Sequence, residues 1–171
     1  RGVDTELFNP NKRDTNSKDR QLTYVGRVAI EKNIEEFLKL KGNYNKIVVG
    51  DGPELEKYIN KYPEVNFVGV KTGEELAKYY ANADVFVFPS KTDTLGNVIL
   101  EALASGTPVA AYPVTGPIDV LTDEKINTLD NDLLQSIKKA LKVKRVDCRN
   151  FTLNLTWDKC VKEFLEYMVN V

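Results

Sequence analysis

The sequence contains no histidine among its 171 residues. This absence excludes serine–histidine triads, histidine metal sites and histidine proton shuttles from the chain. Cysteine is scarce too, since Cys148 and Cys160 are the only two. They lack the CxxC spacing of a redox or zinc motif and are too few for a disulfide scaffold. This usage is typical of a reducing compartment, so we expect a cytoplasmic location.

An excess of one charge and long apolar runs are also missing. The 24 lysines and arginines nearly balance 25 aspartates and glutamates, so the formal net charge is −1. Such a balance gives no electrostatic reason to expect binding to nucleic acid or to an anionic membrane. No apolar run approaches the ~18 residues that span a bilayer. The 42% share of hydrophobic residues is that of an ordinary globular protein.

Two common nucleotide-binding motifs are incomplete. Gly50 and Gly52 follow an apolar run, but Leu55 stands where GxGxxG requires its third glycine. A Walker A loop is missing as well, because GK[ST] occurs nowhere in the sequence. On their own, the two glycines are also explained by a tight turn between a strand and a helix.

What the sequence does contain is a regular alternation of strand and helix patterns. Apolar, β-rich runs occupy residues 22–25, 46–49, 65–69, 85–88, 109–112 and 126–129. Helical patterns occupy residues 33–40, 54–60, 72–81, 96–104, 118–121, 131–142 and 157–169. Repeated β–α units predict an α/β fold, a Rossmann-like, doubly wound parallel sheet covered by helices on both faces. Ligands of such sheets bind outside the carboxyl ends of the strands.

The first twenty residues differ from the rest of the chain. Between Asn9 and Gln21, Pro10 is the only apolar residue, so we expect this stretch not to pack. We therefore predict an interdomain segment over residues 1–20 and one domain over residues 21–171. Together these features suggest a fragment of a longer protein, with a processed N-terminus as the alternative.

Two cationic residues lie close together at the predicted carboxyl edge of the sheet. Arg27 follows Gly26 at the end of the first strand, and Lys32 stands at the start of the first helix. The planar guanidinium of Arg27, the compact ammonium of Lys32 and a helix N-terminus together could bind a diphosphate. Two solvated surface cations are the alternative interpretation.

The most informative stretch is SKTDTLGNVILE, residues 90–101. Gly96 permits close backbone approach at a helix start, where free N–H groups favour an anion. Asp93 precedes that helix, and Glu101 lies within it between two apolar pairs. An acid on so apolar a helix is costly unless it is hydrogen-bonded, and ligand hydroxyls could supply those bonds. An exposed helix face is the alternative for Glu101.

These motifs resemble the retaining glycosyltransferases of the GT-B fold, family 4, also called glycosyl transferases group 1. Five pieces agree in order: VGRVAIEKN, VVGDGPELEK, VNFVG, YYANADVFVFPS and TDTLGNVILEALASGTPVAAYPVTGP. They cover nearly the whole chain and are similar to the C-terminal, nucleotide-sugar-binding domain of that family. RGVDTELFNP is similar to the segment that joins its two domains. The resemblance implies that the chain is one half of a GT-B fold, without the N-terminal acceptor domain.

The resemblance also implies roles for the matching residues. Arg27 and Lys32 would hold the donor diphosphate, Asp93 the hydroxyls of the transferred sugar, and Glu101 those of the ribose. These four form the implied catalytic set. The implied donor-binding set is Gly26, Gly50, Gly52, Val70, Lys71, Leu95, Gly96 and Asn97. Asp93 departs from the family's E-x7-E motif, which has glutamate there, so the sugar stays unassigned.

The function implied is sugar transfer, with retention, from a UDP- or GDP-linked donor to a glycan or lipid acceptor, without a metal or cofactor. The acceptor would bind the absent domain, so this chain alone would bind donor but complete no transfer. The last helix, about residues 156–171, either docks on its own sheet or crosses to that domain. Peripheral association of the full-length protein with the inner face of a membrane stays open. A non-catalytic nucleotide-binding domain in a scaffold is the first rival. A nucleotide-sugar epimerase and a phosphorylase are further rivals, and the complete TDT…E pattern argues against both.

Overall fold

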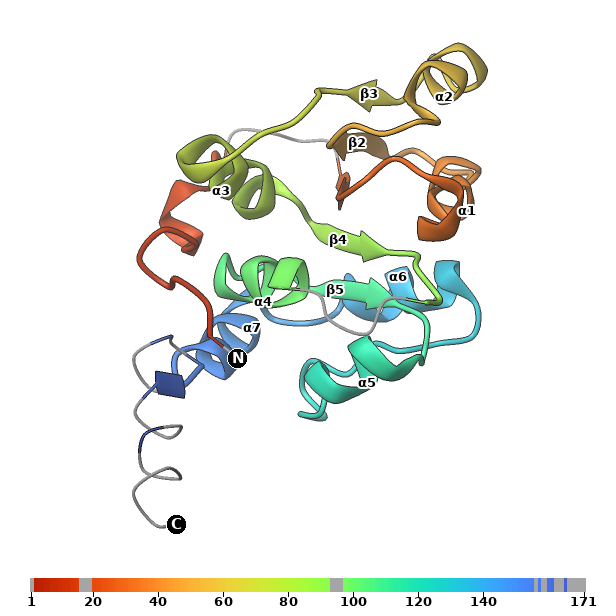
Figure 1. Ribbon diagram of the computed structural model, residues 1–171. Helices are drawn as coiled ribbons and strands as arrows, with labels where there is room; N and C mark the ends of the chain where they lie inside the picture. The colour runs from red at the N-terminus through yellow and green to blue at the C-terminus, as the bar shows by residue number, and fades with distance from the viewer. Residues whose placement is uncertain are drawn as a thin grey trace.

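The computed structural model describes residues 2–15, 20–92, 97–155, 157, 160, 161 and 165. Its centre is a five-stranded parallel sheet in the order β3-β2-β1-β4-β5 (Figure 1). The strands are β1 (Gln21–Val25), β2 (Asn45–Val49), β3 (Asn66–Phe67), β4 (Val85–Phe88) and β5 (Val109–Ala111). The α-helices are α1 (Ile34–Leu38), α2 (Leu55–Lys61), α3 (Gly73–Asn82), α4 (Asn97–Ala104), α5 (Thr115–Val120), α6 (Leu133–Ala140) and α7 (Arg145–Thr152). Two 3-10 helices are η1 (Pro10–Lys12) and η2 (Ile30–Lys32). The predicted α/β, Rossmann-like fold is confirmed.

The two faces of the sheet are covered by different helices. Along β4 the side chains alternate, so that Phe86 and Phe88 join one apolar cluster while Val85 and Val87 join the other. The first cluster includes buried residues of α3, α4 and α7, and the second includes those of α1, α2 and α6. All four β4 side chains are buried, as expected for a central strand of a parallel sheet.

The order of the strands reverses next to β1. From β1 the chain proceeds outward to β2 and β3, then returns to β4 on the other side of β1 and continues to β5. β1 pairs with β2 over its whole length, whereas its pairing with β4 is confined to Leu22↔Val85 and Thr23↔Phe86. At such a switch point the two connecting loops diverge and leave a crevice at the carboxyl edge.

Two elements differ from the sequence prediction. No strand forms at residues 126–129, which are turn and irregular backbone; there the Thr128 hydroxyl donates to the Val109 carbonyl of β5. Helix α7 was not predicted, because only Cys148 and Thr152 of its eight residues are buried and they form no broad apolar stripe. The predicted helix over residues 157–169 lies mostly outside the described part of the chain.

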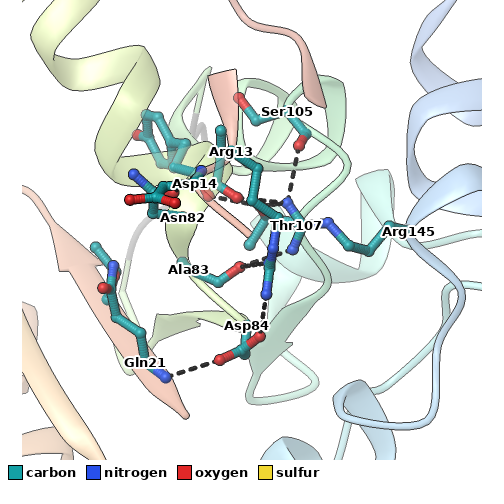
Figure 2. A network of polar contacts seen from close by, with 12 residues as sticks. Arg13, Asp14, Gln21, Asn82, Ala83, Asp84, Ser105, Thr107 and Arg145 are labelled. Atoms are coloured by element: carbon teal, nitrogen blue, oxygen red, sulfur yellow. Dashed lines mark hydrogen bonds and ion pairs between the residues drawn. The ribbon is translucent and has the colours of Figure 1, made fainter. Parts of the chain in front are cut away.

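Helix α7 carries an arginine that ties two other helices together (Figure 2). The Arg145 guanidinium donates to the carbonyls of Ala81 and Ala83, each at 2.7 Å, and of Ser105 at 3.1 Å. It also donates to the Thr107 hydroxyl at 3.1 Å. These carbonyls belong to the ends of α3 and α4, where backbone acceptors lack intrahelical partners and a cation is favoured. Burial lowers the pKa of Arg145 to about 10, so it stays protonated at neutral pH.

A second arginine of α7 holds the start of the chain. Arg149 donates to the carbonyls of Phe8 at 2.8 Å and Thr5 at 3.0 Å, and to that of Ala104 at the end of α4 at 2.9 Å. The Phe8 side chain is itself buried in the cluster that contains α3 and α4. Residues 2–8 are therefore packed onto the domain by both an apolar anchor and a charged one.

We expected residues 9–21 not to pack against the domain. For the residues of this stretch that the structure describes, the expectation is wrong. Lys12 forms an ion pair with Glu74 at 2.5 Å. Arg13 forms one with Asp84 at 2.7 Å (Figure 2). A polar stretch can pack against a domain through ion pairs of this kind. A prediction based on hydropathy does not detect them. Residues 16–19 are outside the described part of the chain, and the domain boundary at residue 20 stays a prediction.

Among the residues that the structure describes, no helix is long and apolar enough to cross a bilayer.

We predict that Arg145→Met lowers the free energy of unfolding by about 2–5 kcal/mol, because the acceptors of Ala81, Ser105 and Thr107 lose their charged donor, while the Ala83 carbonyl keeps Arg13 at 3.2 Å. Urea unfolding measures the loss. Lys142→Met, an exposed neighbour, is the matched control and should change stability by less than about 0.5 kcal/mol. Equal effects of the two substitutions would show that Arg145 does not hold α3 and α4 together.

Candidate functional site

A cavity of about 420 Å³ lies at the crevice between β1 and β4. Its walls come from the end of β1 and the following loop, from the end of β4, and from the first residues of α4. The lining residues are Tyr24, Val25, Gly26, Arg27, Glu31, Lys32, Phe88, Ser90, Asn97 and Val98. We call this hollow the first cavity. It occupies the place where an open α/β sheet offers a ligand site.

A second cavity of about 270 Å³ adjoins the first. It lies toward β2 and β3 and is lined by Val25, Gly26, Arg27, Val49, Gly50, Asp51, Val70 and Lys71. Val25, Gly26 and Arg27 border both cavities, so a ligand seated at these residues could extend into either. The site is therefore elongated along the carboxyl edge of the sheet.

The loops that form this edge are joined through their backbones. The Gly26 amide donates to the Val49 carbonyl at 3.0 Å, and the Gly50 amide donates to the Gly69 carbonyl at 2.9 Å. Gly50 has a φ of +141°, and a Cβ there would lie 1.9 Å from the Gly26 carbonyl oxygen. A Cβ at Gly52 would lie 2.3 Å from the Val28 carbonyl oxygen. The tight-turn interpretation of these glycines thus has a direct physical basis, and Gly50 also lines the second cavity.

Arg27 stands where the two cavities meet. Its guanidinium is 62% exposed and pairs with Glu31 at 3.4 Å, and its carbonyl accepts a hydrogen bond from the Tyr24 hydroxyl at 2.8 Å. Exposed pairs of this kind contribute about 0–1 kcal/mol, so an anionic ligand could displace Glu31 at low cost. Lys32, at the end of η2, lines the first cavity beside it. The structure therefore brings both predicted cations to one hollow.

Asn33 connects the two walls of the first cavity. It is not among the site residues predicted from the sequence. Its backbone is left-handed, with φ +52° and ψ +27°, a conformation that asparagine tolerates better than most residues. Its side-chain amide donates to the Pro89 carbonyl at 2.9 Å, just beyond β4. The turn that carries Arg27 and Lys32 is thereby fixed to the end of the neighbouring strand. The sequence feature that could have identified Asn33 is an asparagine directly before a helix.

Glu101 has a partner that the sequence did not reveal. Its carboxylate Oε2 accepts a hydrogen bond from the Tyr80 hydroxyl of α3 at 2.9 Å. Burial raises the pKa of Glu101, and the hydrogen bond from Tyr80 acts in the opposite direction. The alternative of a fully exposed helix face is wrong, because the residue is half-buried. Glu101 lies one turn beyond Asn97 and Val98, outside the described lining of both cavities.

The remaining predicted site residues fall into two groups. Asn97 begins α4 and lines the first cavity, while Val70 and Lys71 line the second. Gly52 is not among the residues described as lining either one. Asp93, Leu95 and Gly96 lie outside the described part of the chain, so their roles stay predictions. Within the described ranges, no cluster of three or more metal-ligating side chains is present.

We predict that Gly50→Ala lowers the free energy of unfolding by about 2–4 kcal/mol, since the new methyl group meets the Gly26 backbone and the φ is unfavourable as well. Gly69→Ala is the matched control. Gly69 also has a positive φ, of +73°, but a Cβ there has nothing within 4 Å, so about 1–2 kcal/mol should be lost. Chemical unfolding of both variants compares the losses, and a larger loss for Gly69→Ala would contradict the close-approach argument.

Comparison with known proteins agrees with this geometry. The family model described as "Glycosyl transferases group 1" matches residues 6–150. A GDP-mannose-dependent alpha-mannosyltransferase of Corynebacterium glutamicum is 38% identical over 144 residues, covering 78% of this chain and 35% of that protein. Sulfoquinovosyl transferase SQD2 of Arabidopsis thaliana is 38% identical over 143 residues, covering 73% and 27%. The chain thus spans about a third or less of these relatives.

A solved structure extends the similarity to almost every residue. Sucrose-phosphate synthase from Thermosynechococcus elongatus superposes with a TM-score of 0.79 at 25% identity. The match covers 99% of this chain and 52% of that one.

Proposed function

Because the chain belongs to the glycosyl transferases group 1 family, we propose that it is the donor-binding domain of a retaining glycosyltransferase. The whole protein would transfer a sugar from a nucleoside diphosphate to a glycan or lipid acceptor. The observation that most directly supports this proposal is the first cavity, which places Arg27 and Lys32 beside the first residues of α4. Two cations and a helix N-terminus at one hollow suit a diphosphate.

The same groups would also assist the reaction. As the bond between sugar and phosphate breaks, negative charge develops on the departing nucleoside diphosphate. Arg27 and Lys32 would stabilise this charge more strongly than that of the bound donor, which lowers the barrier. The acceptor would attack from the side of the leaving group, so the configuration of the sugar would be retained. These charges come from the protein, so the proposal requires no metal or cofactor.

The donor would extend along the edge in both directions from its phosphates. Its base and ribose would lie toward Gly50, Val70 and Lys71 of the second cavity, with Glu101 at the ribose hydroxyls. Its sugar would lie toward Asp93. A UDP- or GDP-linked donor fits the proposal, and relatives named GDP-mannose-dependent mannosyltransferases support the second of these.

The proposal also covers the acceptor and the cellular location of the whole protein. A further domain would bind the acceptor, with the last helix of this chain crossing to it, and this chain alone would bind donor without transferring sugar. We place the whole protein in the cytoplasm, where a lipid acceptor would bring it to the inner face of a membrane.

We predict that Arg27→Ala weakens GDP and UDP by about 10-fold or more but leaves guanosine and uridine nearly unchanged. A charge-assisted contact to phosphate is worth about 1.5–3 kcal/mol, and every 1.4 kcal/mol is tenfold in affinity. Isothermal calorimetry measures each dissociation constant. Lys39→Ala is the matched control, since Lys39 is also an exposed cation paired with glutamates but lines neither cavity. Equal losses for nucleoside and diphosphate would place Arg27 away from the phosphates.

We also predict that the affinity for GDP or UDP changes by less than about twofold when a chelator removes divalent metal, because side-chain cations neutralise the phosphates. Calorimetry with excess magnesium and then with excess chelator makes the comparison. Loss of binding in the chelator would overturn the metal-independent mechanism.

A further inference from the structure

The contact between Tyr80 and Glu101 joins two helices on the same face of the sheet. Tyr80 belongs to α3 and Glu101 to α4, and their side-chain oxygens lie 2.9 Å apart. The Tyr80 side chain has no solvent exposure, whereas Glu101 is half-buried. The buried phenol therefore donates to a half-buried carboxylate one helical turn beyond the α4 residues that line the first cavity.

The direction of the Tyr80 hydroxyl is set by its surroundings. Its ring packs edge-on against Phe8 at 5.7 Å between centroids and against Phe86 of β4 at 5.5 Å. Its backbone carbonyl accepts a hydrogen bond from the Thr107 hydroxyl at 2.6 Å. These two ring contacts and the complete burial of the side chain restrain the Tyr80 ring in a closely packed core. The phenol is thus a rigid donor.

A rigid donor changes what Glu101 can do. The bond occupies Oε2 and leaves Oε1 to accept hydrogen bonds from a ligand. Burial raises the pKa of Glu101, and the hydrogen bond from Tyr80 opposes this shift. Burial also raises the pKa of Tyr80 well above 10, so the phenol remains a donor across the pH range of a binding experiment.

We propose that Tyr80 is a positioning residue, which aims the Glu101 carboxylate at the ribose hydroxyls of a bound nucleoside diphosphate. The inference rests on the proposed function and goes beyond it, since Tyr80 touches neither donor nor acceptor. Removing the hydroxyl frees the carboxylate to rotate and favours its protonated form, which is the poorer acceptor.

The test compares Tyr80→Phe, Glu101→Gln and the double variant with GDP, UDP and pyrophosphate as probes. We expect Tyr80→Phe to weaken GDP and UDP by about 5- to 10-fold at pH 7 and to leave pyrophosphate unchanged, because pyrophosphate has no ribose. In the Glu101→Gln background, Tyr80→Phe should cause no further loss, since residues acting through one contact are not additive.

The pH dependence gives a readout that a merely structural role would not move. Above the pKa of Glu101 both proteins hold its carboxylate ionised, so the deficit of Tyr80→Phe should be largest at acidic pH and shrink as the pH rises past that pKa. Tyr58→Phe is the matched control, because Tyr58 is also a buried tyrosine but belongs to the cluster on the opposite face of the sheet. It should leave all three affinities unchanged.

The outcomes separate the inference from the function on which it rests. If none of the three probes binds the unaltered chain, both fail together. If the nucleotides bind but Tyr80→Phe has no effect, weakens pyrophosphate equally, or adds to the loss of Glu101→Gln, the inference alone is overturned. If Glu101→Gln leaves nucleotide binding unchanged, the inference also fails while phosphate binding by Arg27 and Lys32 survives.

Discussion

The reversal of strand order beside β1 is the constraint on which the rest of the structure depends. Parallel strands place all their carboxyl ends at one edge, and the chain must leave β1 and β4 in opposite directions. The hollow between them holds the turn with Arg27 and Lys32 on one wall and the start of α4 on the other. The two cations and the N-terminus of α4 meet there because the topology brings them together, although about 65 residues separate Lys32 from Asn97 in the sequence.

The sequence predicted the framework and the position of the site for the same physical reason. Continuous apolar runs such as residues 85–88 and glycines after strands are local signals, and they locate the strands and their carboxyl ends. Helix α7 was missed because its stabilising groups are Arg145 and Arg149, whose acceptors are backbone carbonyls of other helices. The Tyr80–Glu101 contact was missed because it pairs two helices, and no spacing along one helix predicts it.

The arginines of α7 also explain why a polar N-terminal segment is ordered. Carbonyl groups at the ends of α3 and α4 and along residues 5–8 all point to the same region, and two guanidinium groups satisfy them. Tyr80 packs against Phe8 within this arrangement. The segment that precedes the sheet therefore supports the pair of helices, α3 and α4, that carries Tyr80 and the candidate ribose-binding carboxylate of Glu101.

The backbone bonds among the loops after β1, β2 and β3 have an evolutionary consequence. Val28 donates to the carbonyl of Asp51, as Gly26 and Gly50 donate to their neighbours, so the frame of the second cavity is built almost without side chains. Val70 and Lys71 line that cavity and take no part in these backbone bonds, whereas the Asp51 carboxylate accepts a hydrogen bond from the Gly52 amide at 2.7 Å. Under the proposed function, substitutions at Val70 and Lys71 would change which base is accepted while the fold persists. A scaffold of this kind permits divergence in donor preference through few mutations, whereas the glycines beneath it stay constrained.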